Sequence, residues 1–230
     1  MNSRFEQTLR RLNERHGDAF LTMLTVLLVL LMFVLVPIIA AGSAPTQILA
    51  GLVALTLIVG AVTMSGNLTV FVVLLVALVI QVGVAVSRFA GAHSSHHLYL
   101  LALAWLMFTV AFGWVVARAV FGPGRVTVHR IVGAVFLYLL IAIAFASLFA
   151  LLGYFIPNAF SGIAFVDTPR LTGTLFYFSI VTLTSTGYGD LFPVHPIARS
   201  LCNLETILGQ LYPATLLARL VSLEVVARRP

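Results

Sequence analysis

The stretch Thr182-Leu183-Thr184-Ser185-Thr186-Gly187-Tyr188-Gly189-Asp190 is the part of this sequence around which the fold is organised. Its hydroxyl residues lead directly into two glycines that are separated by one tyrosine. Glycine adopts positive φ without the steric cost that a Cβ imposes, so a backbone with glycine at alternate positions can alternate its conformation. Such a backbone can aim successive carbonyl oxygens to one side. A ring of these oxygens can replace the water shell of a monovalent cation, so the stretch predicts a cation-binding loop.

The segment from Ser185 to Gly189 resembles the selectivity filter of potassium channels, with Thr184 before it and Asp190-Leu191-Phe192-Pro193 after it as in that family. In that family, the carbonyl oxygens of the loop replace the hydration shell of potassium. Many members carry Thr-Val where this chain has Ser185-Thr186. Ser185 keeps the hydroxyl of the innermost ion site, whereas ion occupancy and filter stability can differ. The resemblance implies a filter made of Thr184, Ser185, Thr186, Gly187, Tyr188, Gly189 and Asp190, with potassium at Ser185, Thr186, Gly187 and Tyr188.

Composition indicates an integral membrane protein. The chain is 61% hydrophobic and only 9% charged, with a mean hydropathy of +1.11, whereas soluble domains carry about 25% charged residues. The net charge of +6 comes from thirteen basic residues, all arginine and mostly at loop ends. This distribution suits membrane orientation rather than nucleic-acid binding. We find no nucleophile–base pair, metal-ligand spacing or phosphate loop, so we expect no enzyme activity and no cofactor besides potassium ions. Cys202 lies in an apolar segment and is expected to pack in the core.

Apolar runs predict an all-α integral membrane fold with six transmembrane helices, a re-entrant pore helix and a selectivity-filter loop. Thr168-Pro169 is typical of an N-cap and a first-turn proline, and it predicts a short helix over residues 169–183. At about 22 Å this helix is too short to span a membrane, so it should enter and return where it lines a pore. The expected spans are 19–41, 47–63, 68–86, 98–120, 131–155 and 196–221.

Arginine placement predicts that both termini are cytoplasmic, and the family resemblance implies the inner membrane of a prokaryotic cell. The cytoplasmic arginines are then Arg4, Arg10, Arg11, Arg15, Arg118, Arg125, Arg130, Arg219, Arg228 and Arg229, against Arg88, Arg170 and Arg199 outside. The predicted parts are a cytoplasmic amphipathic helix (1–18), a four-helix membrane domain (19–121), a linker (122–130), a pore domain (131–222) and a short cytoplasmic tail (223–230). The first of these could lie on anionic lipid or simply fix the topology.

The chain has one pore loop, so a closed ring of carbonyls needs several copies. The potassium channel resemblance implies four, that is, a homotetramer with potassium ions and membrane lipid as its other partners. The predicted arrangement of six spans, with the pore loop between the last two, resembles that of voltage-gated potassium channels. The fourth span of those channels carries regularly spaced basic residues. Here that span holds only Arg118, at its cytoplasmic end. Steep voltage dependence needs about three to four charges per subunit, so we expect weak or absent voltage gating.

The last span carries polar residues at helical spacing. Asn203, Thr206 and Gln210 could line a wet cavity. Gly209 with Pro213 predicts a bend, which can be a gating hinge or a static kink. The resemblance to potassium channels places Gly209 at the position where the inner pore helices of that family carry a hinge glycine.

Glu205 is costly within a span and is therefore a functional hypothesis. It could brace the filter by accepting hydrogen bonds from Thr182 or Thr184, or face the cavity and concentrate cations. We favour bracing, because the polar stripe fills the cavity position better. Tyr177 and Phe178 match the aromatic positions that support the filter in the family.

His93, His96 and His97 should lie outside, either as a plain polar loop or as a proton or zinc sensor. The leading hypothesis is a homotetrameric, passive, potassium-selective channel. The alternatives are a weakly selective cation channel and a non-conducting membrane sensor or partner subunit. A transporter with inverted repeats would need paired broken helices, and the sequence shows one such element.

Overall fold

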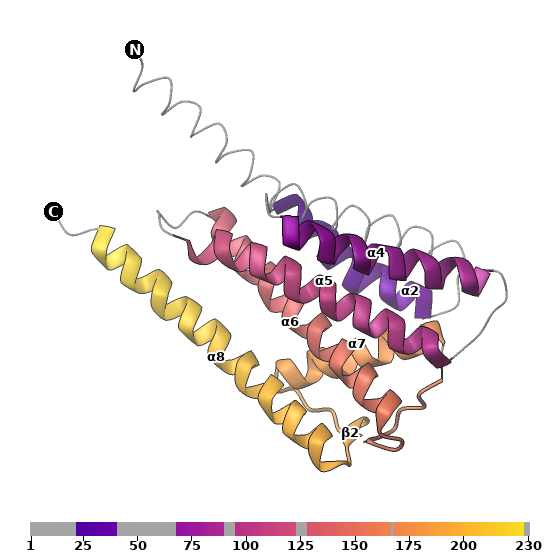
Figure 1. Cartoon of the computed structure of the whole chain (residues 1–230). Coiled ribbons are helices and arrows are strands. Elements are labelled where there is room, and N and C mark those ends of the chain that lie inside the picture. The colour runs from indigo at the N-terminus through magenta and orange to yellow at the C-terminus, as the bar shows by residue number, and fades with distance from the viewer. Residues whose placement is uncertain (1–21, 41–67, 90–94, 123–127, 167, 228–230) are drawn as a thin grey trace.

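The computed structural model describes residues 22–40, 68–89, 95–122, 128–166 and 168–227. The predicted helix 1–18, the predicted span 47–63, most of the linker and His93 lie outside the described residues. The long helices are α4 (Leu68–Phe89), α5 (Ser95–Phe121), α6 (Val128–Phe155) and α8 (Pro196–Ala227), with the shorter α7 (Pro169–Leu183) between α6 and α8 (Figure 1). The helix α8 runs past its expected end at Val221.

The first predicted span is helical over its described part, an apolar helix from Thr22 to Ile38. Its middle is π-helical, η1 (Leu31–Leu35), and is followed by α2 (Val36–Ala40). Pro37 lacks the N–H of a normal helical residue and crowds the carbonyl four residues before it. The Val36 N–H donates to Leu31 O, five residues back, so the helix widens by one residue per turn just before the proline.

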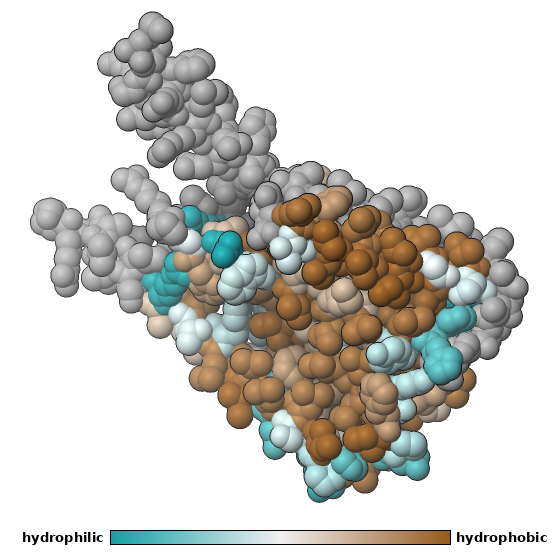
Figure 2. Space-filling model, in the orientation of Figure 1, coloured by the Kyte–Doolittle hydropathy of each residue, from teal (hydrophilic) through white to brown (hydrophobic). Residues whose placement is uncertain are grey.

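Three of the described helices are long and apolar enough to cross a membrane: Leu68–Arg88, His96–Phe121 and Arg130–Phe155, with hydropathies of 2.9, 2.2 and 2.8. Figure 2 shows hydrophobic side chains across the middle of the molecule and hydrophilic ones gathered toward its ends. The helix α8 has 32 residues but is less apolar than these three. It contains the polar residues expected to face a cavity and the buried Glu205.

The helices α4, α5 and α6 pack in sequence order, and α5 lies along α6. One core cluster joins the first helix, α4, α5 and α6. At its centre Phe112 meets Phe108 and Phe136 edge to face, with ring centroids 5.4 and 5.1 Å apart. Such geometry suits the quadrupoles of the rings. The α4–α5 pair is therefore packed onto the helix that precedes the candidate pore segment.

The helix α7 has the bounds that the sequence predicted. Thr168 Oγ1 accepts from Leu171 N at 3.3 Å, and the proline sits in the first turn. Besides α6 and α8, α7 contacts α2, and Phe33 meets Phe176 edge to face with centroids 6.4 Å apart. The helix α7 thus lies among other helices, whereas the loop beyond its end, residues 184–190, is exposed in the single chain.

Two short strands flank this region, and the sequence analysis did not predict them. β1 (Phe160–Ser161) pairs antiparallel with β2 (Phe192–Pro193), with Phe160 opposite Pro193. In addition, Val194 N and His195 N donate to Ala159 O at 2.9 and 3.2 Å. The loop before α7 is thereby fixed to the segment that follows the candidate filter.

Candidate functional site

The backbone after α7 alternates in the way that the glycine spacing predicts. Among the described residues of this loop, Ser185, Gly187 and Gly189 have positive φ, at 57°, 58° and 81°. Ser185 is not a glycine, and it occupies the left-handed position that closes the helix end. Ser185 N donates to Thr182 O at 3.0 Å and Thr186 N to Val181 O at 2.9 Å, the paired bonds of a Schellman cap. The cap therefore starts an alternation that the two glycines continue.

Hydroxyl groups and two residues of the α8 stripe contact the base of this loop. Gln210 Nε2 donates to Ser185 Oγ at 2.8 Å, and Thr206 Oγ1 donates to Thr182 O at 3.3 Å. Thr184 Oγ1 and Thr186 Oγ1 lie 2.8 Å apart. Asn203 is exposed on the same helix. The polar stripe thus binds the end of α7 as well as presenting polar groups to solvent.

The two predicted aromatic residues have different positions. Tyr177 donates to Asp190 Oδ2 at 3.0 Å, and its ring stacks on Tyr188 with centroids 6.2 Å apart and planes 2° from parallel. Phe178 is buried on the other side of α7 and packs against Phe149, with centroids 5.0 Å apart. Tyr177 therefore contacts the candidate filter itself, whereas Phe178 holds α7 against α6.

Glu205 is fully buried and faces α7 rather than the solvent side of α8. Its Oε1 accepts from Ser179 Oγ, which also lies 2.7 Å from Ala142 O on α6. The threonines that the sequence suggested as donors are not its partners. Thr182 Oγ1 donates to Phe178 O and Thr184 Oγ1 to Ile180 O, because a threonine hydroxyl in a helix reaches the carbonyl four residues back. The residue that sequence analysis missed is Ser179, one helical turn before Thr182.

At Gly209 the backbone of α8 closely approaches the last residue of α7. A Cβ at this position would lie 1.8 Å from Leu183 O and 2.8 Å from Leu183 C. The helix α8 is continuous through Gly209 and Pro213. The glycine therefore has a packing reason to be there, independent of any hinge, and the predicted hinge stays a prediction.

Two arginines, one from α6 and one from α8, donate hydrogen bonds to backbone carbonyls at the C-terminal end of α5. Arg130 Nη1 donates to Gly122 O at 2.9 Å, and Arg219 Nη2 donates to Phe121 O at 3.0 Å. Arg219 also lies over the Phe121 ring, 5.0 Å from its centroid. These bonds satisfy carbonyls that a helix end leaves open and connect α8 to α5.

Of the predicted histidine cluster, His96 and His97 are described, and they lie in the first turn of α5 rather than in a loop. His96 Nδ1 is 2.9 Å from Tyr154 Oη on α6, and His97 Nε2 is 3.1 Å from Ser87 Oγ on α4. Within the described ranges, no group of three His, Cys, Asp or Glu side chains is placed to hold a metal ion. Cys202 is buried, as predicted.

Comparison with known proteins locates the similarity in the same region. Residues 141–225 match the model of a family described as ion channel. The inward rectifier potassium channel Kirbac3.1 of Paramagnetospirillum magnetotacticum is 37% identical over 75 residues, which is 33% of this chain and 23% of that protein. The chain thus covers less than a quarter of that relative. No solved structure matches. The two matches confirm the resemblance to the potassium channel family that the filter sequence indicates.

Proposed function

We propose that the chain forms a homotetrameric, potassium-selective channel that conducts passively across the cell inner membrane. The observation that supports it most is the alternation of positive φ at Ser185, Gly187 and Gly189. An alternating backbone turns successive carbonyls to one side, which is what coordination of a dehydrated potassium ion requires. The ion sites are formed by Ser185, Thr186, Gly187 and Tyr188.

A ring around one axis needs further copies of the loop, and exposed apolar side chains are available to pack against them. Tyr188 is 70% exposed in the single chain, and Ile207 and Leu211 on α8 are 54% and 55% exposed. A closed cyclic assembly buries such residues repeatedly and equally. The topology that fits this assembly has six spans, with both termini cytoplasmic and the filter near the outer face.

Voltage dependence is expected to be weak or absent. Within α5, the arginine is Arg118 in the last turn, and it lies over the Trp114 ring, 4.9 Å from its centroid. A steep response needs about three to four charges per subunit that cross the field. The packing of α5 along α6 also leaves it attached to the pore part of the chain.

The proposal is tested by reversal potentials of the purified protein in planar bilayers under potassium and sodium gradients, repeated across voltage. We expect reversal near the potassium equilibrium potential and an open probability that is nearly flat in voltage. Reversal near zero would instead support a weakly selective cation channel, the alternative that Ser185-Thr186 in place of Thr-Val raises. An absence of current, with the tetramer intact, would support a non-conducting sensor or partner subunit.

A further inference from the structure

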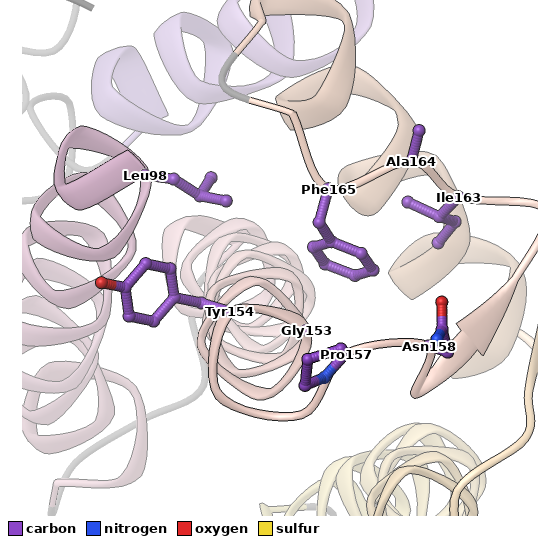
Figure 3. Close-up of a pocket in the computed structure, with 8 residues that line it drawn as sticks. All are labelled: Leu98, Gly153, Tyr154, Pro157, Asn158, Ile163, Ala164 and Phe165. Carbon is purple, nitrogen blue, oxygen red and sulfur yellow. The ribbon is translucent and has the colours of Figure 1, made fainter. Parts of the chain in front are cut away.

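A cavity of about 470 Å³ lies at the C-terminal end of α6. Its wall comes from three parts of the chain: α5, the C-terminal turn of α6 with its following loop, and the segment between β1 and α7 (Figure 3). The volume lies within the range of small-molecule sites, about 300–1,000 Å³. The lining residues are Leu98, Gly153, Tyr154, Pro157, Asn158, Ile163, Ala164 and Phe165.

The side chains that line the cavity are uncharged and mostly apolar, with one amide at the edge, while polar and apolar atoms share the exposed wall about equally. In Figure 3, the Phe165 ring points toward the α6 backbone at Gly153, and the Asn158 side chain points toward Ile163. Tyr154 points away, toward α5, where its hydroxyl meets His96 Nδ1 at 2.9 Å. Apolar walls with a few placed polar groups are typical of sites that bind neutral organic ligands.

The shape of the cavity depends on a bare backbone at Gly153. A Cβ there would lie 1.9 Å from the Phe165 ring, so the ring rests directly on the α6 backbone. Asn158 has a φ of 60°, a conformation that asparagine tolerates better than most residues. These two positions fix the aromatic wall and the amide on opposite sides of the space.

The cavity wall is also attached to the outer end of the candidate filter. Gly162 follows β1 with a φ of 81°, and a Cβ there would lie 2.5 Å from Asp190 O. The strand pair and the bonds to Ala159 O hold the two segments together. A ligand that fixes Phe165 therefore also fixes the backbone beside Asp190.

We propose that this cavity binds an uncharged small molecule with an aromatic or aliphatic body and one hydrogen-bonding group, and that its occupation alters conduction. The apolar body contacts Leu98, Ile163 and Phe165, and the polar group meets the Asn158 amide. The effect on conduction rests on the proposed channel function, whereas binding at the cavity does not.

Binding is tested with benzophenone, a neutral aromatic ketone whose light-activated carbonyl inserts into nearby C–H bonds. The full chain in liposomes is irradiated with the probe, and the labelled peptides are identified by mass spectrometry. We expect the main labelled residues within 153–165. Ile163→Trp, which fills the space, should lower this labelling about tenfold, as a lost contact energy of about 1.4 kcal/mol would.

The matched control is Val166→Trp, which adds the same side chain three positions along. Val166 is 62% exposed and is not part of the cavity lining, so labelling should be unchanged. Asn158→Gly provides a second test, because glycine accepts a φ of 60° without strain. It should weaken labelling while leaving the fold intact. Labelling that is absent from 153–165, or equal in Ile163→Trp and the control, would overturn the proposed site.

Potassium efflux from the same liposomes separates the two levels of the proposal. We expect benzophenone to change the efflux at least about twofold in the parent protein and in Val166→Trp, with little change in Ile163→Trp. Labelling without any change in an active channel overturns the link to conduction. A protein that shows no efflux at all refutes the channel function instead, and labelling still decides the binding site.

Discussion

Replacing Gly209 with alanine should disturb the candidate filter rather than only stiffen α8. The new Cβ would lie 1.8 Å from Leu183 O, whereas ordinary contacts begin at 3.4 Å. The colliding atom is backbone, so α8 and α7 must separate by about 1.6 Å. That movement would break the neighbouring 2.8 Å bond from Gln210 to Ser185. Overpacking of this kind costs about 1–3 kcal/mol, against about 1 kcal/mol that alanine gains over glycine in helix propensity.

The assays are the temperature at which the proposed tetramer dissociates in detergent and the potassium-to-sodium permeability ratio in bilayers. Gly209→Ala should lower both. The matched control is Gly83→Ala on α4, where an added Cβ meets no atom within 4 Å. It should leave the permeability ratio unchanged and keep or slightly raise the dissociation temperature, because alanine favours a helix over glycine. If Gly209→Ala keeps the stability and selectivity of the control and changes only open probability, the packing argument is wrong and the hinge hypothesis gains support.

Three further predictions concern single contacts. Glu205→Gln should keep the stability of the proposed tetramer, because its amide can donate to Ser179 Oγ while Ser179 donates to Ala142 O on α6. Glu205→Leu should lower that stability by about 1–3 kcal/mol, measured by thermal dissociation. Equal stability of the two variants would contradict this. Tyr177→Phe removes the hydrogen bond to Asp190 but keeps the ring. The potassium current recorded in bilayers should then decline about fivefold faster with time, as a loss of about 1 kcal/mol implies. An unchanged time course would show that this hydrogen bond does not support the filter. Arg219→Gln should change the open probability up to about fivefold, because the hydrogen bond from Arg219 to Phe121 O is lost, and it should leave ion selectivity unchanged. A change in selectivity would show that Arg219 does more than connect α8 to α5.

Local signals in the sequence predicted the most local features of the site. Thr168-Pro169 defines the start of α7 because capping depends on neighbouring residues alone. The glycine spacing predicted the alternating backbone for the same reason, and both features are present in the structure. The orientation of Glu205 toward α7 was also expected, since a carboxyl within a span needs a polar partner.

Features that depend on distant segments could not be predicted in this way. Ser179 looks like an ordinary serine of a short helix until the fold brings it against Glu205, 26 residues later. The role of Gly209 depends on how closely α8 approaches Leu183, which no local pattern encodes. The β1–β2 pair is too short for alternation to be detected. The π-helical turn had a signal in Pro37, but a proline alone predicts a disturbance without its form.

The contact of α7 with α2 has a consequence for biogenesis. Domains form as the chain is synthesised, from the N-terminus onward, so the helix that contains Phe33 and α6 both leave the ribosome before α7. A helix of 15 residues is too short to insert across a bilayer alone, and the irregular backbone that follows it needs protein around it. Helices that are already inserted then offer α7 a surface, on which Phe176 meets Phe33. Lesions on that surface should therefore appear as reduced yield of assembled protein, whereas the molecules that do assemble keep their conducting properties.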